Sequence, residues 1–203
     1  NKSNKVLSVK INEVKPHTQF GVTLKNIDLA VYQSEILGIG GVAGNGQEEL
    51  MHILTGEKKD RNVSIKYMDN DVEMLNPRER REIGWAFAPE ERLVHAAVGN
   101  LNLLEQSLIT DPKKRFQKKM GFIDFSELNE YTNEIIEKFN VKTTGVSALA
   151  SSLSGGNLQK FVVGREIGQK PSLFIVNQPT WGVDALSAAH IRQALVEIAN
   201  NGA

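Results

Sequence analysis

The chain has 203 residues, with 24 lysines and arginines balanced by 24 aspartates and glutamates, 4 histidines and no cysteine. This balance gives no global electrostatic reason to expect nucleic acid or an anionic membrane as a partner. The lack of cysteine excludes disulfides, thiolate catalysis and cysteine-ligated zinc within the chain. A hydrophobic fraction of 40% is ordinary for a globular domain and excludes disordered, collagenous and disulfide-scaffold classes.

Strands and helices are predicted to alternate along the chain, from the spacing of apolar residues and the turn residues between them. Strands are predicted at residues 6–14, 22–31, 36–40, 63–72 (a hairpin), 83–88 and 173–176, and helices at 47–55, 78–82, 98–108, 125–139, 152–167 (after an entering loop) and 188–198. The charged run 78–82 is interpreted as a solvated face. This alternation indicates an α/β sheet, with the helical block at about 98–140 as an insertion.

A glycine-rich loop at residues 41–46 lies between a predicted strand and a predicted helix, which is a geometry that binds phosphate. Two spacings compete for its interpretation. Gly38-x-Gly40-x-x-Ala43 fits a dinucleotide fingerprint, whereas residues 41–48 fit a nucleotide P-loop whose usual Lys-Ser/Thr pair is replaced by Gln47-Glu48. A plain glycine turn into a helix also fits, so the loop alone leaves the function open.

Three downstream strings decide between these interpretations: LSGGNLQK at residues 153–160, FIVNQPT at 174–180 and PEER at 89–92. With them the chain resembles an ATP-binding cassette (ABC) nucleotide-binding domain over nearly all of its length. The form is that of the C-terminal cassette of tandem-cassette ATPases serving sugar and nucleoside importers. The resemblance implies one α/β domain over 1–203, with a RecA-like P-loop NTPase core, an antiparallel β region and a helical subdomain at about 94–155. It also implies that the chain stops before the switch-histidine region.

The resemblance assigns roles to individual positions. The phosphates would be wrapped by the loop residues Gly41, Gly44, Asn45 and Gly46, and Gln47 and Glu48 stand where Lys and Ser/Thr are usual. Asn177 and Gln178 replace the Walker B Asp and the catalytic Glu. Pro89 and Glu90 lie at the Q-loop, Asp184 matches the D-loop, and residues 93–102 fall where the family contacts its transmembrane subunit. Phe20 stands near the position that stacks on adenine, although a core phenylalanine is an equal alternative.

These substitutions all weaken the domain's own nucleotide site. A missing lysine removes a charge-assisted hydrogen bond worth about 1.5–3 kcal/mol. A missing general base costs about 10²–10⁴-fold in rate, and Asn177 removes a charge that would favour Mg²⁺. Glu48 in the first helical turn would repel a phosphate. We therefore predict a site that is hydrolytically inactive and weak for MgATP, with no metal ligands of its own.

The signature string is intact. In the family, the residues corresponding to Ser154, Gly155, Gly156, Asn157 and Gln159 act in trans on the γ-phosphate of a partner cassette. The resemblance thus implies an asymmetric dimer in which ATP and Mg²⁺ occupy the partner's site. It implies a sister N-terminal cassette in the same longer chain, permease subunits as partners, no nucleic acid, and a peripheral location at the cytoplasmic face of the cell membrane. The fragment alone is expected to be a monomer.

Three other functions compete with this one: a catalytically silent regulatory or scaffold module, a soluble ABC ATPase domain without a transport role, and a Rossmann oxidoreductase. The last leaves LSGGN unexplained, and only Glu57 or Asp60 could serve as its ribose-binding acid. The four histidines lack the spacing of metal ligands and are predicted to be surface or packing residues: His17, His52, His95 and His190.

Overall fold

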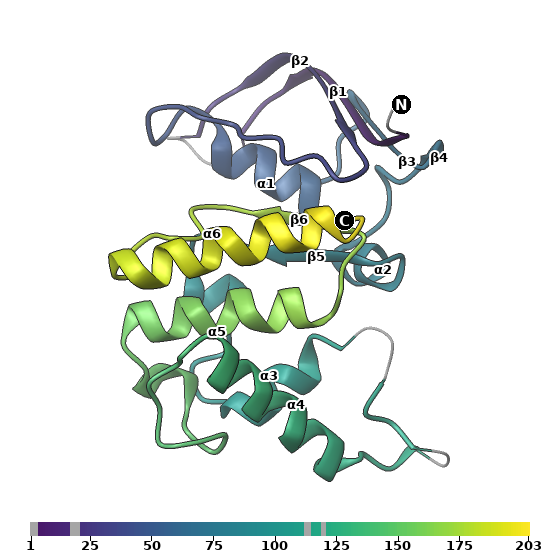
Figure 1. Cartoon of the computed structure of the whole chain (residues 1–203). Helices are drawn as coiled ribbons and strands as arrows, with labels where there is room; N and C mark the ends of the chain where they lie inside the picture. The colour runs from purple at the N-terminus through teal and green to yellow at the C-terminus, as the bar shows by residue number, and fades with distance from the viewer. Residues whose placement is uncertain (1–3, 17–20, 112–114, 119–120) are drawn as a thin grey trace. The chain divides into compact units, whose positions relative to one another are not determined.

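The computed structural model describes residues 4–16, 21–111, 115–118 and 121–203, and Figure 1 shows how the elements follow one another. The chain divides into two compact units. The first comprises Asn1–Trp85 and Val196–Ala203, and the second comprises Ala86–Leu195. The glycine loop therefore belongs to the first unit. The signature string and the strand that precedes Asn177 belong to the second.

An antiparallel sheet of four strands, in the order β2-β1-β3-β4, is the framework of the first unit. Its strands are β1 (Lys5–Val14), β2 (Leu24–Tyr32), β3 (Val63–Tyr67) and β4 (Asn70–Asp71). Val9 of β1 lies opposite Leu29 of β2 and Ile65 of β3. Val9 and Ile65 are fully buried, because alternate residues of a strand point to the same face. The two predicted N-terminal strands and the hairpin are confirmed.

Helix α1 (Gln47–Thr55) follows the glycine loop and packs its apolar stripe inward. Leu50, Ile53 and Leu54 are buried, at the helical spacing seen in the sequence. Gly56 ends the helix in the left-handed conformation, with a φ of 83°, and its N–H donates to the carbonyl of Ile53. The predicted helix and its glycine C-cap are confirmed.

The strand predicted at residues 36–40 is not formed. This segment runs from β2 to the glycine loop without regular secondary structure, and Ile36 and Ile39 are 58% and 54% exposed. A short apolar run becomes a strand only where a neighbouring strand supplies hydrogen-bond partners. Within the described part of the first unit, the sheet offers this segment no such neighbour. The prediction is therefore wrong, because it considered the apolar run without its pairing.

Helix α2 (Pro77–Glu82) contains a buried arginine within its charged run. Arg80 is fully buried, and its Nη1 donates to the carbonyls of Ile53 and Leu54 at 2.9 and 2.6 Å. Burial lowers the pKa of Arg80 to about 10, so the guanidinium remains charged at neutral pH. The interpretation of this run as a solvated face is wrong at Arg80, because its side chain caps the C-terminal carbonyls of α1.

Arg80→Met should lower the free energy of unfolding by about 3 kcal/mol, because it leaves several buried carbonyls without a donor. Denaturant unfolding followed by circular dichroism measures the loss. Arg78→Met is the matched control, since Arg78 is exposed and forms a surface pair with Glu82 at 3.0 Å. It should cost less than about 0.5 kcal/mol. Equal losses in the two variants would contradict the capping role of Arg80.

From residue 85 onward, the chain combines a two-stranded sheet with helices (Figure 1). The elements are β5 (Trp85–Ala88), η1 (Arg92–Ala96, a π-helix), α3 (Leu103–Ile109), α4 (Phe125–Lys138), η3 (Ala150–Ser152, a 3-10 helix), α5 (Gly155–Gly168), β6 (Leu173–Val176) and α6 (Ala185–Asn200). β5 pairs with β6, and the N–H of Asn177 donates to the carbonyl of Ala88 at 2.8 Å. The last two predicted strands are confirmed, with β5 beginning two residues later than predicted.

Helices α3 and α4 lie in the segment expected to be a helical insertion. α3 begins at Leu103 rather than at residue 98, because Asn102 and Glu105 form a capping box that fixes its start. α4 and α5 approach closely, since a Cβ added at Gly164 would lie 2.5 Å from Phe139 at the end of α4. In the described ranges, no helix has the length and apolar character needed to cross a membrane.

Candidate functional site

The glycine loop reaches α1 through two left-handed glycines. Gly44 has a φ of 84° and Gly46 a φ of 103°, a conformation that a side chain would strain. Gly46 precedes α1 as its N-cap without a side-chain hydrogen bond, and a Cβ added there would lie 2.7 Å from Leu24 Cδ2. The loop residues Gly41, Gly44 and Asn45 are exposed. The predicted geometry of loop followed by helix is present.

The side chain of Gln47 folds back across this loop. Its Oε1 accepts a hydrogen bond from the N–H of Asn45 at 3.0 Å, and its Nε2 donates to the carbonyl of Val42 at 3.1 Å. A Cβ added at Gly41 would lie 2.8 Å from this Nε2. The amide oxygen of Gln47 therefore occupies the N–H of Asn45, which could otherwise donate a hydrogen bond to a phosphate oxygen. A lysine at this position would instead extend a positive charge.

The first turn of α1 carries two carboxylates, Glu48 and Glu49. Glu49 Oε1 accepts a hydrogen bond from the N–H of Val22 at 2.7 Å, which ties α1 to the segment before β2. Glu48 is exposed at the same helix end. The helix dipole favours both carboxylates, but a carboxylate at this end also repels a phosphate. Glu49 has a structural partner, whereas Glu48 adds exposed negative charge beside the loop.

The end of β6 presents two neutral amides. Asn177 is half-buried with its backbone paired to β5, and Gln178 follows it, exposed, with a φ of 49°. Pro89 and Glu90, the predicted Q-loop positions, follow β5 directly, and Glu90 is exposed. A magnesium site takes carboxylate oxygens, and neither residue at the end of β6 carries one.

The signature string opens helix α5. Ser154 is its N-cap, and the Ser154 hydroxyl accepts hydrogen bonds from the N–H and the side-chain amide of Asn157 at 3.4 and 2.9 Å. Asn157 in turn accepts from the N–H of Lys142 at 2.9 Å. Ser154 and Gly155 are exposed. The helix therefore begins with an exposed hydroxyl at its N-terminus, where backbone N–H groups are typical donors to an anion.

Gln159 differs from the other signature residues because it is buried, with only 1% of its surface exposed. Its Oε1 accepts a hydrogen bond from Arg92 Nε at 2.9 Å, and its Nε2 donates to the carbonyl of Pro179 at 3.1 Å. Its amide is thus used within this chain. In the sequence Arg92 belongs to the string PEER, and nothing in its spacing indicates this contact with a residue 67 positions away.

Asp184, the predicted D-loop residue, lies at the start of α6. Its two carboxylate oxygens accept hydrogen bonds from the N–H and the hydroxyl of Ser187 at 2.9 and 2.6 Å. The hydroxyl hydrogen bond, followed by that of the backbone N–H, lowers the pKa of Asp184 below its ordinary value of 3.8. Asp184 is therefore an exposed, charged helix cap whose position is fixed locally.

Ser187→Ala should raise the pKa of Asp184 toward 3.8, because it removes the largest cause of the shift. A carboxyl whose pKa is lowered by folding contributes stability above its unfolded pKa and loses it as pH falls through the folded pKa. The wild type should thus show a larger acid-dependent loss of stability below about pH 4 than the variant. NMR titration of the Asp184 carboxyl measures the shift, and identical titrations of the two proteins would contradict this assignment.

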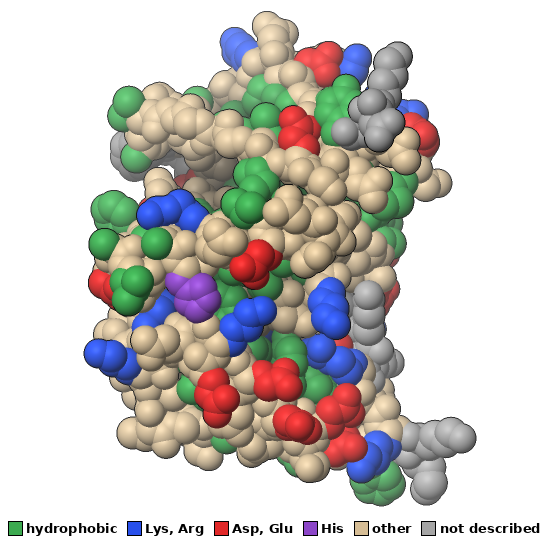
Figure 2. Space-filling model, viewed as in Figure 1, with side chains coloured by type: hydrophobic (Ala, Val, Ile, Leu, Met, Phe, Trp, Pro, Cys, Tyr) green, Lys and Arg blue, Asp and Glu red, His purple; other side chains and the backbone are tan. Residues whose placement is uncertain are grey.

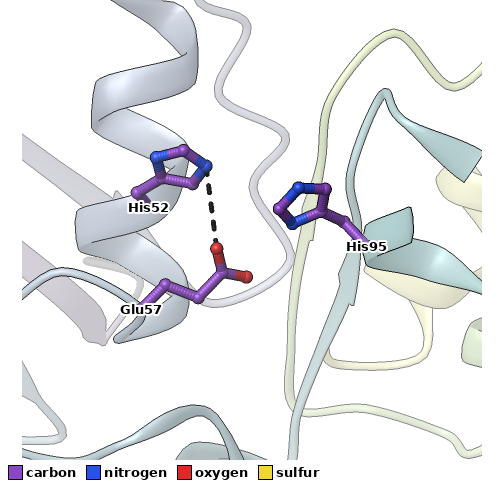
Figure 3. Close-up of side chains that lie close together, drawn as sticks. All are labelled: His52, Glu57 and His95. Carbon is purple, nitrogen blue, oxygen red and sulfur yellow. Dashed lines mark ion pairs between the residues drawn. The ribbon is translucent and has the colours of Figure 1, made fainter. Parts of the chain in front are cut away.

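The described histidines each have a protein partner. His52 and Glu57 form an ion pair of 3.6 Å near the end of α1 in the first unit (Figure 3). His95, in the second unit, pairs with Glu91 at 3.5 Å. His190 stacks on Phe139, with ring centroids 5.5 Å apart. His17 and the proposed adenine-stacking residue Phe20 lie outside the described residues.

A single known protein family accounts for these motifs. The family model described as "ABC transporter" matches residues 24–181. The chain belongs to the ABC transporter ATP-binding family. This match covers the glycine loop, the signature string and the residues after β6, so the resemblance inferred from these motifs is confirmed at the level of the family.

Several curated relatives of this ABC cassette are import ATP-binding proteins. A nucleoside import ATP-binding protein of Lactococcus lactis is 34% identical over 97% of this chain and 39% of its own length. A glucose import ATP-binding protein of Haloferax volcanii is 34% identical over 88% of this chain and 33% of its own length. A guanosine import ATP-binding protein of Bacillus subtilis is 33% identical over 86% of this chain and 34% of its own length. The cassette thus spans well under half of each relative.

Solved structures confirm the fold class. A dimeric ATP-binding cassette in a post-hydrolysis state bound to ADP and Pi has a TM-score of 0.77 and 19% identity, covering 96% of this chain and 83% of its own. A nucleotide-free ATP-binding cassette from an ABC transporter has a TM-score of 0.71 and 21% identity, covering 98% and 78%. The chain therefore has the α/β fold of ABC cassettes, with a RecA-like core.

At the glycine loop, the amide of Gln47 bridges the backbone and Glu48 adds negative charge beside it. In the second unit, the end of β6 carries amides rather than carboxylates. The start of α5 has the opposite character, because its exposed hydroxyl and backbone donors suit a phosphate oxygen. Ser154 thus exposes a hydroxyl at a helix N-terminus, whereas Asn177 and Gln178 carry no carboxylate.

Proposed function

We propose that this cassette is the energy-coupling domain of an ABC importer for a simple sugar or a nucleoside. Family membership and relatives named for nucleoside, glucose, guanosine and ribose import support this proposal. The transported molecule is bound by other components, and this chain provides the nucleotide-dependent step. Charged side chains of both signs are interspersed on the face in Figure 2, so this face lacks the continuous basic patch typical of nucleic-acid binding.

The cassette supplies its signature in trans to the ATP site of a sister cassette, while its own Walker site is inactive. One contrast carries this proposal: Ser154 and Gly155 are exposed at the start of α5, whereas the amide of Gln47 bridges the glycine loop. In the working site, the Ser154 hydroxyl and the N–H groups behind it donate to a phosphate bound by the partner. The charge that develops during hydrolysis strengthens such hydrogen bonds.

The sister cassette lies N-terminal to this one in a longer chain, and the pair sits peripherally at the cytoplasmic face of the membrane against permease subunits. This cassette covers 39% of the length of one relative and 33% of another, which leaves room in those proteins for a second cassette. The domain extends over residues 1–203, with its helical subdomain at about 94–155. ATP and Mg²⁺ are held by the sister's residues.

Gln178→Glu alone should leave the ATPase rate of the full-length protein unchanged, because the site also lacks a lysine and a Walker B carboxylate. Steady-state phosphate release measures the rate. Gln193→Glu, an exposed position on α6, is a control with the same charge change. A rise in turnover specific to Gln178→Glu would show that one missing carboxylate is the whole defect, and the inactive-site proposal would fail.

A further inference from the structure

Helix η1 is fastened to the signature helix α5 at both of its ends. At its start, Arg92 Nε donates to Gln159 Oε1 at 2.9 Å. At its end, the carbonyl of Ala96 accepts a hydrogen bond from Arg165 Nη2 at 2.8 Å. Gln159 and Arg165 are each only 1% exposed, so both attachments have one partner within the core of the second unit. These two attachments, six residues apart on α5, hold both ends of η1 against this helix.

Arg92 also reaches the loop between β6 and α6. Its Nη2 donates to the carbonyl of Trp181. Gln159 reinforces this connection, because its Nε2 donates to the carbonyl of Pro179 at 3.1 Å. One guanidinium therefore joins three segments: η1, the first turns of α5 and the loop that leads to Asp184.

Two glycines make room for the guanidinium. A Cβ added at Gly155 would lie 2.6 Å from Arg92 Nη1, and one added at Gly182 would lie 3.1 Å from Arg92 Nη2. The start of α5 also touches this loop directly, since a Cβ at Gly156 would lie 2.8 Å from the carbonyl of Gly182. The signature glycines thus have a use inside this chain: they let α5, Arg92 and the loop pack together.

We propose that Arg92 is a positioning residue that holds Ser154–Gly156 in register with the loop at residues 178–184. The inference rests on the proposed function, in which Ser154 donates to a phosphate on the sister cassette. Arginine suits this role because its planar fork donates along two directions at once, to Gln159 and to Trp181. A lysine can complete only one of these connections at a time.

Hydrogen exchange in the full-length protein, measured by mass spectrometry, tests the proposal. Arg92→Met keeps the apolar stem and removes both connections. Exchange at residues 153–160 and 178–186 should accelerate about tenfold. Arg192→Met, an exposed position on α6, is the control and should change neither segment. Unchanged exchange in both segments of Arg92→Met would overturn the proposal.

A second variant separates positioning from general destabilisation. Gly155→Ala introduces a Cβ where Arg92 Nη1 lies, so it should displace the guanidinium and accelerate exchange at residues 178–186. In the Arg92→Met background the same change should add nothing at those residues, because the obstacle has been removed. Additive effects of the two changes would overturn the coupling.

Kinetics distinguish this inference from the proposed function. If both hold, Arg92→Met lowers kcat about tenfold with the KM for ATP within twofold, because the sister site still binds nucleotide. Arg92→Lys should recover only part of kcat. If Ser154→Arg leaves turnover intact, the trans role fails, and the exchange measurements still decide whether Arg92 positions the start of α5.

Discussion

Replacing Ser154 with arginine is expected to lower the ATPase rate of the full-length protein at least about 100-fold, since removing one donor that acts on developing charge typically costs that much. The hydroxyl is exposed at the N-terminus of α5, so an arginine there removes the donor and fills the space that a partner's phosphate would approach. Steady-state phosphate release measures the effect.

The matched control is Ser126→Arg. Ser126 is also exposed in the first turn of a helix, but on α4 within the helical segment. Ser126→Arg should leave the ATPase rate within about twofold of the wild type, because a surface substitution away from the site rarely matters. Turnover unchanged in Ser154→Arg would refute the trans role and favour a silent regulatory module. Equal losses in both variants would show only that the fold is sensitive to arginine.

Restoring the usual residues should reopen the cassette's own nucleotide site. Gln47→Lys removes the amide that bridges the glycine loop and supplies a charge-assisted hydrogen bond. That bond, worth about 1.5–3 kcal/mol, corresponds to a gain in MgATP affinity of about 10- to 100-fold. Adding Glu48→Ser, Asn177→Asp and Gln178→Glu removes the remaining repulsion and restores the carboxylates. The variant with all four substitutions should therefore bind MgATP more tightly than Gln47→Lys alone.

Calorimetric titration compares these variants with Gln33→Lys, an exposed position on the turn after β2 that carries the same charge change. The control should not gain affinity. A Gln47→Lys variant that binds MgATP no better than the control would mean that the lost lysine is not what weakens the site. The Gln47 amide bridge would then not be the cause of weak nucleotide binding at this loop.

Sequence alone predicted the parts of the fold whose signals are local. The glycine C-cap at Gly56, the hairpin beginning at Val63 and the apolar strand at residues 173–176 all have turn residues or apolar runs that specify them. Residues 36–40 have the same kind of apolar run, yet form no strand. Whether such a run pairs depends on a neighbour that the local pattern does not contain.

The side-chain contacts of the site were the least predictable. Gln47 was identified as a departure from the usual lysine, but a sequence does not reveal that its amide bridges Val42 and Asn45. The contacts of Arg80 and Arg92 were unpredictable for the same reason: a charged residue in a charged run looks solvated, and its hydrogen-bond partners include carbonyls of distant segments. Gln159 was grouped with the residues that act in trans, although its amide is used inside the chain.

The most direct test of the account is a calorimetric titration of this 203-residue domain with ATP, with and without Mg²⁺. Its central claim is that the glycine loop is closed to nucleotide while the signature remains available to a partner. We expect no binding up to millimolar ATP under either condition. Clear Mg²⁺-dependent binding in the micromolar range would contradict it, and would mean that the loop N–H groups hold ATP despite Gln47 and Glu48.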